Sequence, residues 1–189
     1  GVFRRALELE PLATLSYAVL GEASYRLGRL EEAETFFKQA LEREPQQVAS
    51  LNGLGVVRAA RGDQQSAAEL WQQAIRLNTT DAAPHTNVGQ LFAAQQRWPD
   101  AIASFQRALQ LEPGNPAALD GLAAAYTAVG RFDEAALTYR RAIERQQRPQ
   151  GANSLVTVPD SLADSYTGLG NVLQLQQRHA EALAAYQEA

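Results

Sequence analysis

The sequence has 189 residues, of which 46% are hydrophobic, and a formal net charge of -4 with an isoelectric point near 5.3. This acidic balance argues against a surface whose main role is to bind the phosphates of a nucleic acid. The chain has no cysteine, which excludes disulfide bonds and thiolate chemistry and leaves the cell compartment undetermined, with the cytoplasm slightly favoured.

Three columns of residues recur at intervals of 34 along the chain. They hold a small residue, an aromatic residue and a second small residue: Ala33, Ala67, Ala101 and Ala135; Phe37, Trp71, Phe105 and Tyr139; Ala40, Ala74, Ala108 and Ala142. This period is typical of a helix–turn–helix repeat. A fifth copy follows after an insertion and carries Ala182, Tyr186 and Ala189. The sequence therefore predicts an all-α array of antiparallel helix pairs.

The repeats can be placed along the chain in order. Residues 1–13 match the second helix of a preceding repeat, because Phe3 and Leu7 lie 34 positions before Phe37 and Leu41. We expect repeats over 14–47, 48–81, 82–115 and 116–148, then an inserted loop over 149–160 and a last repeat over 161–189, which is incomplete at its C-terminal end. We therefore expect the sequence to be a segment of a longer array.

The repeat over 14–47 shows the expected division into two helices. One face of a predicted first helix carries Tyr17, Leu20, Gly21 and Ser24. Gly28 separates it from a second helix, which ends near Pro45. We expect Gly21 and Ala33 to let the two helices approach closely, Phe37 to fill the space between them, and Ala40 to admit the next repeat.

Proline and asparagine residues indicate where helices begin and end. Asn115 followed by Pro116 predicts an N-cap and a first helical residue, and Pro99 falls in the first turn of its helix. In the inserted loop, Pro149 is expected to end one helix and Pro159 to precede the start of the next.

These columns resemble the tetratricopeptide repeat family, and the resemblance covers essentially the whole chain apart from the insertion. It departs from the family pattern at a few positions, which we expect to weaken individual interfaces: Thr79, His85, Ser24, Arg58 and Leu173. The resemblance implies a right-handed α-solenoid whose first helices line a concave groove. In most such proteins this groove binds an extended peptide or a partner helix.

The family's groove positions give a set of candidate binding residues in this sequence: Glu22, Tyr25, Asn52, Val56, Thr86, Asn87, Gln90, Asp120, Thr127 and Asn171. Several carry amide or hydroxyl groups that can hydrogen-bond to a peptide backbone. Glu22 and Asp120 favour a neutral or basic ligand. The family's clamp for a C-terminal carboxylate is not expected, because its positions hold no cation that could pair with the carboxylate. Alternatively, these residues are only solvated polar positions on a helix face.

No catalytic, metal or cofactor site is expected in the sequence. The chain has only two histidines, His85 and His179, and neither has a second ligand at a metal-binding spacing. The Gly53-Leu54-Gly55 segment is interpreted as helix packing and not as a phosphate loop, because no strand precedes it. The longest apolar stretch, residues 122–129, falls far short of the ~20 residues that cross a bilayer, so no membrane insertion is expected.

The function that these observations favour is a non-enzymatic scaffold that binds a protein or peptide and no nucleic acid. One alternative is a regulatory or substrate-recruiting segment of a larger enzyme, such as a glycosyltransferase. Another is a homotypic assembly module, because both ends carry apolar repeat faces, with Phe3 and Leu7 at one end and Leu183 and Tyr186 at the other. Self-association through these ends is therefore also an expectation.

Overall fold

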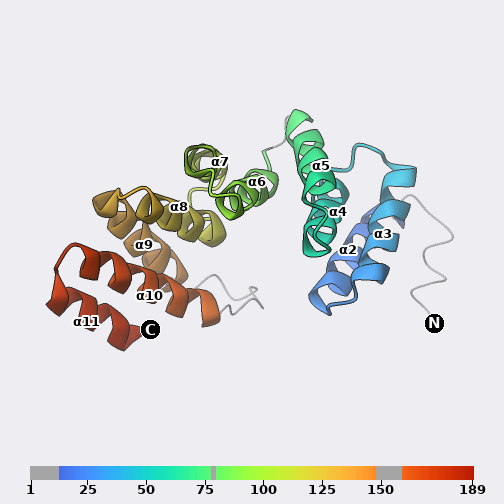
Figure 1. Ribbon diagram of the computed structural model, residues 1–189. Coiled ribbons are helices and arrows are strands. Elements are labelled where there is room, and N and C mark those ends of the chain that lie inside the picture. The colour runs from blue at the N-terminus through green and yellow to red at the C-terminus, as the bar shows by residue number, and fades with distance from the viewer. Residues whose placement is uncertain (1–12, 78–79, 148–158) are drawn as a thin grey trace. The chain divides into compact units, whose positions relative to one another are not determined.

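The computed structural model describes residues 13–77, 80–147 and 159–189 (Figure 1). The predicted remnant over 1–13 and the predicted loop over 149–160 lie outside these ranges, apart from Ala13, Pro159 and Asp160, which are helical. Within the described residues there are ten helices and no strand. The helices are α2 (Ala13–Arg26), α3 (Leu30–Arg43), α4 (Val48–Ala60), α5 (Gln64–Arg76), α6 (Ala83–Ala94), α7 (Trp98–Leu111), α8 (Pro116–Ala128), α9 (Phe132–Gln147), α10 (Pro159–Leu175) and α11 (His179–Glu188).

The residues form two compact units, 1–87 and 88–189. In the first unit α2 packs against α3 and α4 against α5, and α4 also contacts α3 and α2 (Figure 1). In the second unit α8 packs against α9 and α10 against α11, while α8 also contacts α7, and α10 contacts both α9 and α8. Within each unit the helices therefore pair as antiparallel hairpins, and consecutive hairpins contact each other, which is the arrangement of an α-solenoid.

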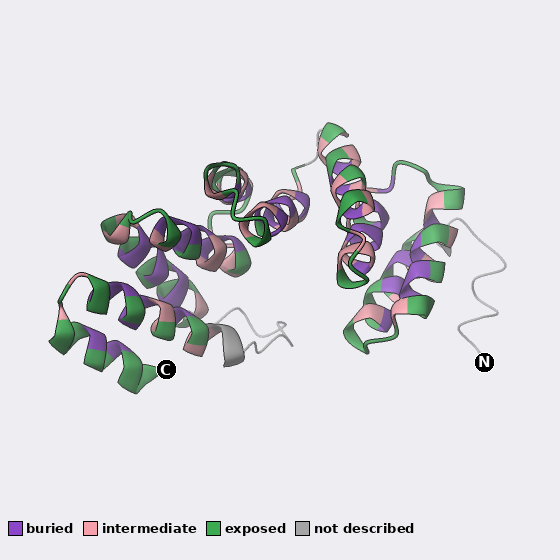
Figure 2. Cartoon of the chain, in the orientation of Figure 1, coloured by how far each residue is buried: buried purple, intermediate pink, exposed green. Residues whose placement is uncertain are grey.

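The repeated small and aromatic residues form the core of each unit. Ala33, Ala67, Ala101 and Ala135 are fully buried, and Figure 2 shows buried residues on the facing sides of the paired helices. The ring of Phe37 lies between two glycines: a Cβ atom on Gly21 would come within 2.7 Å of the ring, and one on Gly53 within 2.3 Å. This confirms that glycine allows the close approach and that the aromatic ring fills the space between the helices.

The turns between paired helices share one backbone conformation. One residue in each turn has a positive φ angle: Gly28 (72°), Gly62 (84°), Gln96 (56°), Gly130 (77°) and Gln177 (61°). Glycine adopts this left-handed conformation at little cost, whereas glutamine does so at a steric penalty. The break at Gly28 was predicted, but the two glutamines in the same column were not recognised as strained positions.

Two helix starts carry the residues that the sequence indicated, Asn115 and Pro99. The side chain of Asn115 accepts a hydrogen bond from the backbone N–H of Ala118 at 2.9 Å, which confirms it as the N-cap of α8. Pro99 lies in the first turn of α7, as expected. Asp63 also caps a helix, since it accepts a hydrogen bond from the backbone N–H of Ser66 at 3.1 Å.

Candidate functional site

Two candidate residues lie on α2 and differ in exposure. Glu22 is exposed, and its carboxylate accepts a hydrogen bond from the guanidinium of Arg26 at 2.8 Å. Tyr25 is half-buried and packs against the hydrophobic cluster of the first unit, which includes Ala33 and Phe37. Glu22 is therefore the more exposed of the two, and its charge is balanced by a neighbouring arginine on the same helix.

Asn52 and Asn87 come from α4 and α6 and contact each other directly. The side-chain amide of Asn87 donates a hydrogen bond to the side-chain oxygen of Asn52, with 2.7 Å between Nδ2 and Oδ1. Both side chains are partly exposed. The indole N–H of Trp71 donates to the backbone oxygen of Asn52 at 3.2 Å. The hydrogen bond between the two side chains fixes them relative to each other. It uses one N–H donor of Asn87 and one acceptor site on the Asn52 oxygen.

The Asn52–Asn87 pair keeps unused hydrogen-bonding groups. Within the part of the chain that the structure describes, the Nδ2 amide of Asn52 donates to no group and the Oδ1 oxygen of Asn87 accepts from none. An amide nitrogen carries two donors and an amide oxygen two lone pairs, so both atoms can bind a ligand without breaking the pair. The pair therefore presents a donor and an acceptor side by side.

Asn87 occupies a column that is usually glycine in this chain. The equivalent residues in other repeats are Gly53, Gly121 and Gly168, and each lies against an aromatic ring of the preceding second helix. The ring that precedes Asn87 is Trp71, which contacts Gly55 of its own hairpin and donates to the Asn52 carbonyl. The position that elsewhere receives a ring thus carries a polar side chain here.

The remaining candidates in α4 and α6 contribute less to a polar surface. Val56 is half-buried. Thr86 is only 5% exposed, and its hydroxyl donates to the backbone oxygen of Ala82 at 3.1 Å. Gln90, in the second unit, is exposed. Thr86 therefore has its hydroxyl bound within its own helix, while Gln90 is open to solvent.

In the second unit, two further candidates already take part in internal hydrogen bonds. Thr127 on α8 is half-buried and donates to the backbone oxygen of Ala123 at 2.9 Å. Asn171 on α10 is exposed and accepts a hydrogen bond from the hydroxyl of Tyr186 at 2.8 Å. Because its amide oxygen has a second lone pair and its amide nitrogen two donors, Asn171 can still bind a further group.

Asp120 joins three helices through a buried polar network. Its Oδ1 atom accepts a hydrogen bond from the Ser165 hydroxyl at 2.6 Å, and Ser165 is fully buried on α10. The side-chain amide of Gln146 on α9 donates to the Ser165 hydroxyl at 3.1 Å. This network, which the sequence did not reveal, holds Asp120 between α8, α9 and α10.

Burial dominates the electrostatics of this network. It raises the pKa of the Asp120 carboxyl above its usual 3.8; the hydrogen bond from Ser165 opposes this rise, and the charge of Asp164 adds to it. Burial also raises the pKa of Tyr139 to about 12, and the nearby charge of Asp120 contributes. Because Asp120 is tied into the packing of its own unit, its position combines a structural role with the predicted binding role.

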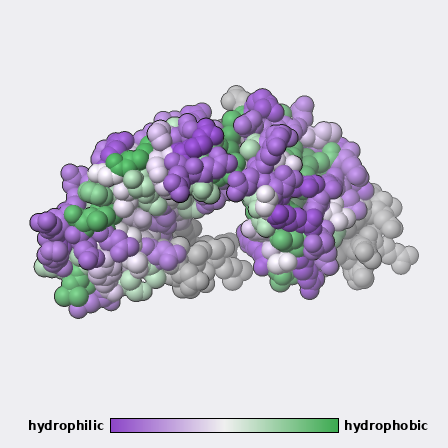
Figure 3. Space-filling model, in the orientation of Figure 1, coloured by the Kyte–Doolittle hydropathy of each residue, from purple (hydrophilic) through white to green (hydrophobic). Residues whose placement is uncertain are grey.

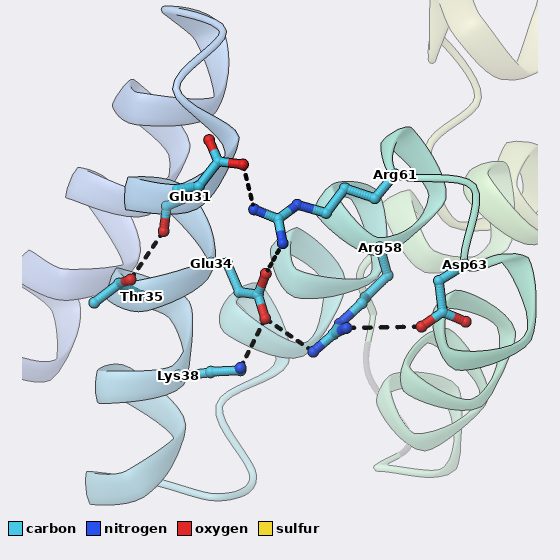
Figure 4. Close-up of polar contacts among 7 residues, drawn as sticks. All are labelled: Glu31, Glu34, Thr35, Lys38, Arg58, Arg61 and Asp63. Carbon is cyan, nitrogen blue, oxygen red and sulfur yellow. Dashed lines mark hydrogen bonds and ion pairs between the residues drawn. The ribbon is translucent and has the colours of Figure 1, made fainter.

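A cluster of charged residues, which was not predicted from the sequence, joins α3 to the end of α4 (Figure 4). The carboxylate of Glu34 contacts three cations, with distances of 2.9 Å to Arg58, 2.6 Å to Arg61 and 2.7 Å to Lys38. Arg61 also binds Glu31 at 2.8 Å. The Glu34 side chain is only 11% exposed, so these contacts are partly desolvated.

Arg58 therefore has a defined partner in Glu34, while the expectation that it weakens its interface stays a prediction. In the next repeat the equivalent residue is Phe92, and the guanidinium of Arg97 in the following turn lies 4.3 Å from its ring centre. In the repeat that contains Arg58 the arginine is on the helix instead of in the turn. The turn that follows α4 carries Asp63, whose carboxylate lies 3.7 Å from the Arg58 guanidinium. The signal in the sequence was a charged residue, Arg58, in a column that is aromatic or aliphatic in the three later repeats.

The described surface carries no sign of a metal site or of a membrane span. None of the described helices is long and apolar enough to cross a bilayer, and no group of three or more metal-binding side chains occurs among the described residues. In Figure 3 hydrophilic side chains cover much of the visible face, with apolar residues in smaller groups between them.

Comparisons with known proteins identify similar sequences and folds. Four family models, all described as tetratricopeptide repeat, match residues 15–47, 34–84, 92–156 and 162–189. No curated protein matches the chain by sequence.

The chain is also similar to several solved structures. MamA is 22% identical with a TM-score of 0.69, and the match covers 89% of this chain and 91% of that one. YrrB, described as a TPR protein with an unusual peptide-binding site, is 18% identical with a TM-score of 0.66 and coverages of 100% and 90%. PilF of Pseudomonas aeruginosa is 19% identical with a TM-score of 0.78 and coverages of 92% and 73%. At these identities the likeness shows the fold alone.

Proposed function

The chain belongs to the tetratricopeptide repeat family, and we propose that it is a non-catalytic scaffold that binds a peptide or a partner helix along the first helices of its repeats. Membership of this family and the similarity to YrrB, which has a peptide-binding site, support this proposal. Function is nevertheless decided by the residues of the site and not by the fold.

The observation that carries the proposal is the Asn52–Asn87 pair. Its unused donor on Asn52 and unused acceptor on Asn87 are the complement of a peptide bond, which offers one C=O and one N–H. An extended segment that crosses α4 and α6 binds there through its backbone, because the C=O accepts from Asn52 and its N–H donates to Asn87.

The charge of the candidate residues sets the preferred ligand. None of the ten candidates is cationic, and Glu22 and Asp120 are acidic. A free C-terminal carboxylate would lose its hydration on binding without gaining a cationic partner, which is unfavourable. The ligand we propose is therefore an internal, neutral or basic segment of a protein.

Affinity capture with a matched pair of variants tests this function. The full chain, Asn52→Ala/Asn87→Ala and Gln72→Ala are each used as bait in a lysate of the source organism. Gln72 is an exposed amide on the second helix α5, so its loss leaves the candidate site intact. We expect the captured partner to be lost with the asparagine variant alone, while helical circular dichroism stays unchanged. A partner that binds all three baits equally would contradict a site on the first helices.

Homotypic assembly is a second candidate, and one observation favours it. Leu183 and Tyr186 on α11 are 59% and 37% exposed, although residues of the aromatic column are buried in the other repeats. Exposed apolar residues of this kind promote association. Sedimentation of the full chain over a range of concentrations tests this candidate, since a mass that stays at the monomer value throughout would exclude it.

A further inference from the structure

The junction between α3 and α4 differs in kind from the equivalent junctions further along the chain. In the column of Glu34 the later repeats carry small or aliphatic residues: Ala68, Ile102 and Ala136. In the column of Arg58 they carry aromatic or aliphatic residues: Phe92, Tyr126 and Leu173. The junction between α3 and α4 therefore carries an ion pair, whereas the sequence places aliphatic, aromatic or small residues at both positions of the later junctions.

Apolar packing alone does not distinguish one first helix from another. Phe37 packs on Gly53 so tightly that a Cβ atom would come within 2.3 Å of the ring. A Cβ atom on Gly121 would come within 2.4 Å of the Phe105 ring, and one on Gly168 within 2.4 Å of the Tyr139 ring. At each of these three glycines an aromatic ring occupies the space that a Cβ atom would fill, so α8 and α10 each carry a glycine equivalent to the one that Phe37 meets on α4. Repeat proteins with interchangeable faces are prone to mispairing and domain swapping.

The charged cluster does distinguish between the helices. Arg58 in the last turn of α4 and Arg61, which directly follows α4, both contact the carboxylate of Glu34. The equivalent residues are Tyr126 and Val129 at the end of α8, and Leu173 and Gln176 at the end of α10; Val129 and Gln176 each directly follow the last residue of the helix. If α3 packed on either of those helices, Glu34 would keep Lys38 of its own helix but would lose both arginines. The loss of partners from a largely buried carboxylate is destabilising.

The cluster is also balanced, so it imposes little penalty on the correct pairing. It consists of three acids and three bases that interact across α3, α4 and the start of α5: Glu31, Glu34, Asp63, Lys38, Arg58 and Arg61 (Figure 4). The reverse argument holds for Arg58, because a second helix other than α3 offers it Ala68, Ile102 or Ala136 in place of an acid.

From these contacts we propose that the Glu34–Arg58–Arg61 cluster is a pairing lock, which restricts α3 to α4 and prevents the first repeat from docking on another repeat of the same or a second chain. Stability is supplied by the apolar columns, and the ions supply the choice of partner. The role is independent of any ligand.

The test is a double variant that makes this junction apolar like the next one. Glu34→Ala/Arg58→Phe installs the residues that stand at positions 68 and 92. The full chain is unfolded in denaturant and refolded at high concentration, and its mass is measured by size exclusion with light scattering. We expect the wild type to refold to one species, and the variant to give an additional swapped dimer that persists on dilution. Reversible association of chain ends would instead disappear on dilution.

Two further variants, Glu32→Ala and Glu34→Gln, serve as a control and as a second test. Glu32→Ala removes an exposed charge from α3 whose partner, Arg29, lies in the same hairpin, so it is expected to refold like the wild type. A double variant that folds and gives no more dimer than the wild type overturns the pairing lock. If the double variant fails to fold, Glu34→Gln decides instead: persistent dimers on refolding support the lock, and their absence overturns it.

Discussion

The ring of Phe37 lies so close to Gly53 that a methyl group on this glycine would come within 2.3 Å of the ring's Cζ atom. The ring belongs to one hairpin and the glycine to the next. The distance therefore measures how tightly consecutive repeats are joined within the first unit. A contact this short leaves no room for any other side chain at position 53 unless the ring or the helix moves.

Gly53→Ala is expected to lower the free energy of unfolding by about 1–3 kcal/mol, the usual cost of overpacking a core. A loss of stability would be informative, because the helix propensity of alanine alone would raise the free energy of unfolding by roughly 1 kcal/mol relative to glycine. Urea denaturation monitored by circular dichroism measures the change. In a Phe37→Leu background the ring is absent, and the cost of Gly53→Ala should shrink. An equal cost in both backgrounds would show that the ring is not the cause.

Gln96→Gly and Gln177→Gly are expected to raise the stability of the chain. Both glutamines have positive φ angles in a column that is glycine in three other turns. Relief of the left-handed strain outweighs the added freedom of glycine in the unfolded chain, so a gain of about 0.5–1 kcal/mol is expected in each case. Thermal and urea unfolding measure it. Ala94→Gly, in the last turn of α6, serves as the control and should lower stability.

Glu34→Gln should remove part of the acid sensitivity of the chain. The hydrogen bond from Lys38 is the main cause that lowers the pKa of Glu34 below its usual 4.5; burial opposes this, and the charges of Arg58 and Arg61 lower it further. A lowered native pKa stabilises the fold above pH 4.5, and this contribution disappears as the pH falls through the native value.

At pH 7 the Glu34→Gln variant is therefore expected to be less stable than the wild type by about 1–3 kcal/mol, since hydrogen bonds to a charged group are replaced by neutral ones. The difference should narrow steadily once the pH falls below 4.5. Urea unfolding at several pH values checks this. Glu31→Gln, at an exposed acid of the same cluster, is the control and should have little effect. A difference between Glu34→Gln and the wild type that is independent of pH would contradict the ionic origin of the effect.

Asp120→Asn is expected to raise the stability of the chain at pH 7, whereas Glu34→Gln is expected to lower it. Because burial raises the pKa of Asp120, the native state binds a proton more readily than the unfolded chain does. The charged carboxylate therefore costs stability at neutral pH, and this cost is relieved as the pH falls through the raised native pKa. An asparagine keeps an oxygen for the Ser165 hydroxyl but carries no charge. We expect the variant to be more stable at pH 7 by about 1 kcal/mol, a typical size for one substitution.

The same unfolding series separates this effect from a packing change. The advantage of Asp120→Asn should disappear in acid, where the wild-type carboxyl is protonated in the folded and unfolded chain. Asp164→Asn removes the exposed neighbouring charge and should change stability much less. An Asp120→Asn variant that is less stable than the wild type at every pH would mean that the ionised form is needed for the network.

Much of the fold could be predicted because it depends on residues that recur at a fixed interval. The aromatic column containing Phe37 and the glycine at position 21 are visible as a pattern, and their packing follows from size alone. The N-cap at Asn115 is equally local, because one side chain and its own helix decide it. These features need no knowledge of how distant parts of the chain are placed.

The features that were not predicted depend on single contacts between different helices. Glu34 and Arg58 are 24 residues apart, and their pairing follows from the rotation of two helices, which the repeat pattern does not specify. The bond between Ser165 and Asp120 joins residues 45 apart across the insertion. The binding role of residues such as Asn52 and Gln90 stays a prediction, although the pairing of Asn52 with Asn87 gives it a specific geometry.

Val19 allows the proposed self-association to be tested in a directed way. It occupies the column of Gly53, Gly121 and Gly168, which receive an aromatic ring from the preceding second helix, and it is 66% exposed on α2. The exposed ring of Tyr186 on α11 is the residue that a neighbouring copy would have to place there. The branched side chain of Val19 keeps a ring further away than a glycine would, because at the equivalent glycines a Cβ atom would come within 2.4 Å of the ring.

Val19→Gly should therefore strengthen end-to-end association, with a mass that increases with concentration in sedimentation experiments. Adding Tyr186→Ala to the same chain should reverse the increase, because the ring that fills the new space is gone. Val19→Ala is the matched control: it removes exposed apolar area but keeps the Cβ atom, so it should not promote association. If Val19→Gly and Val19→Ala behave alike, the chain does not associate through the contact that joins its own repeats.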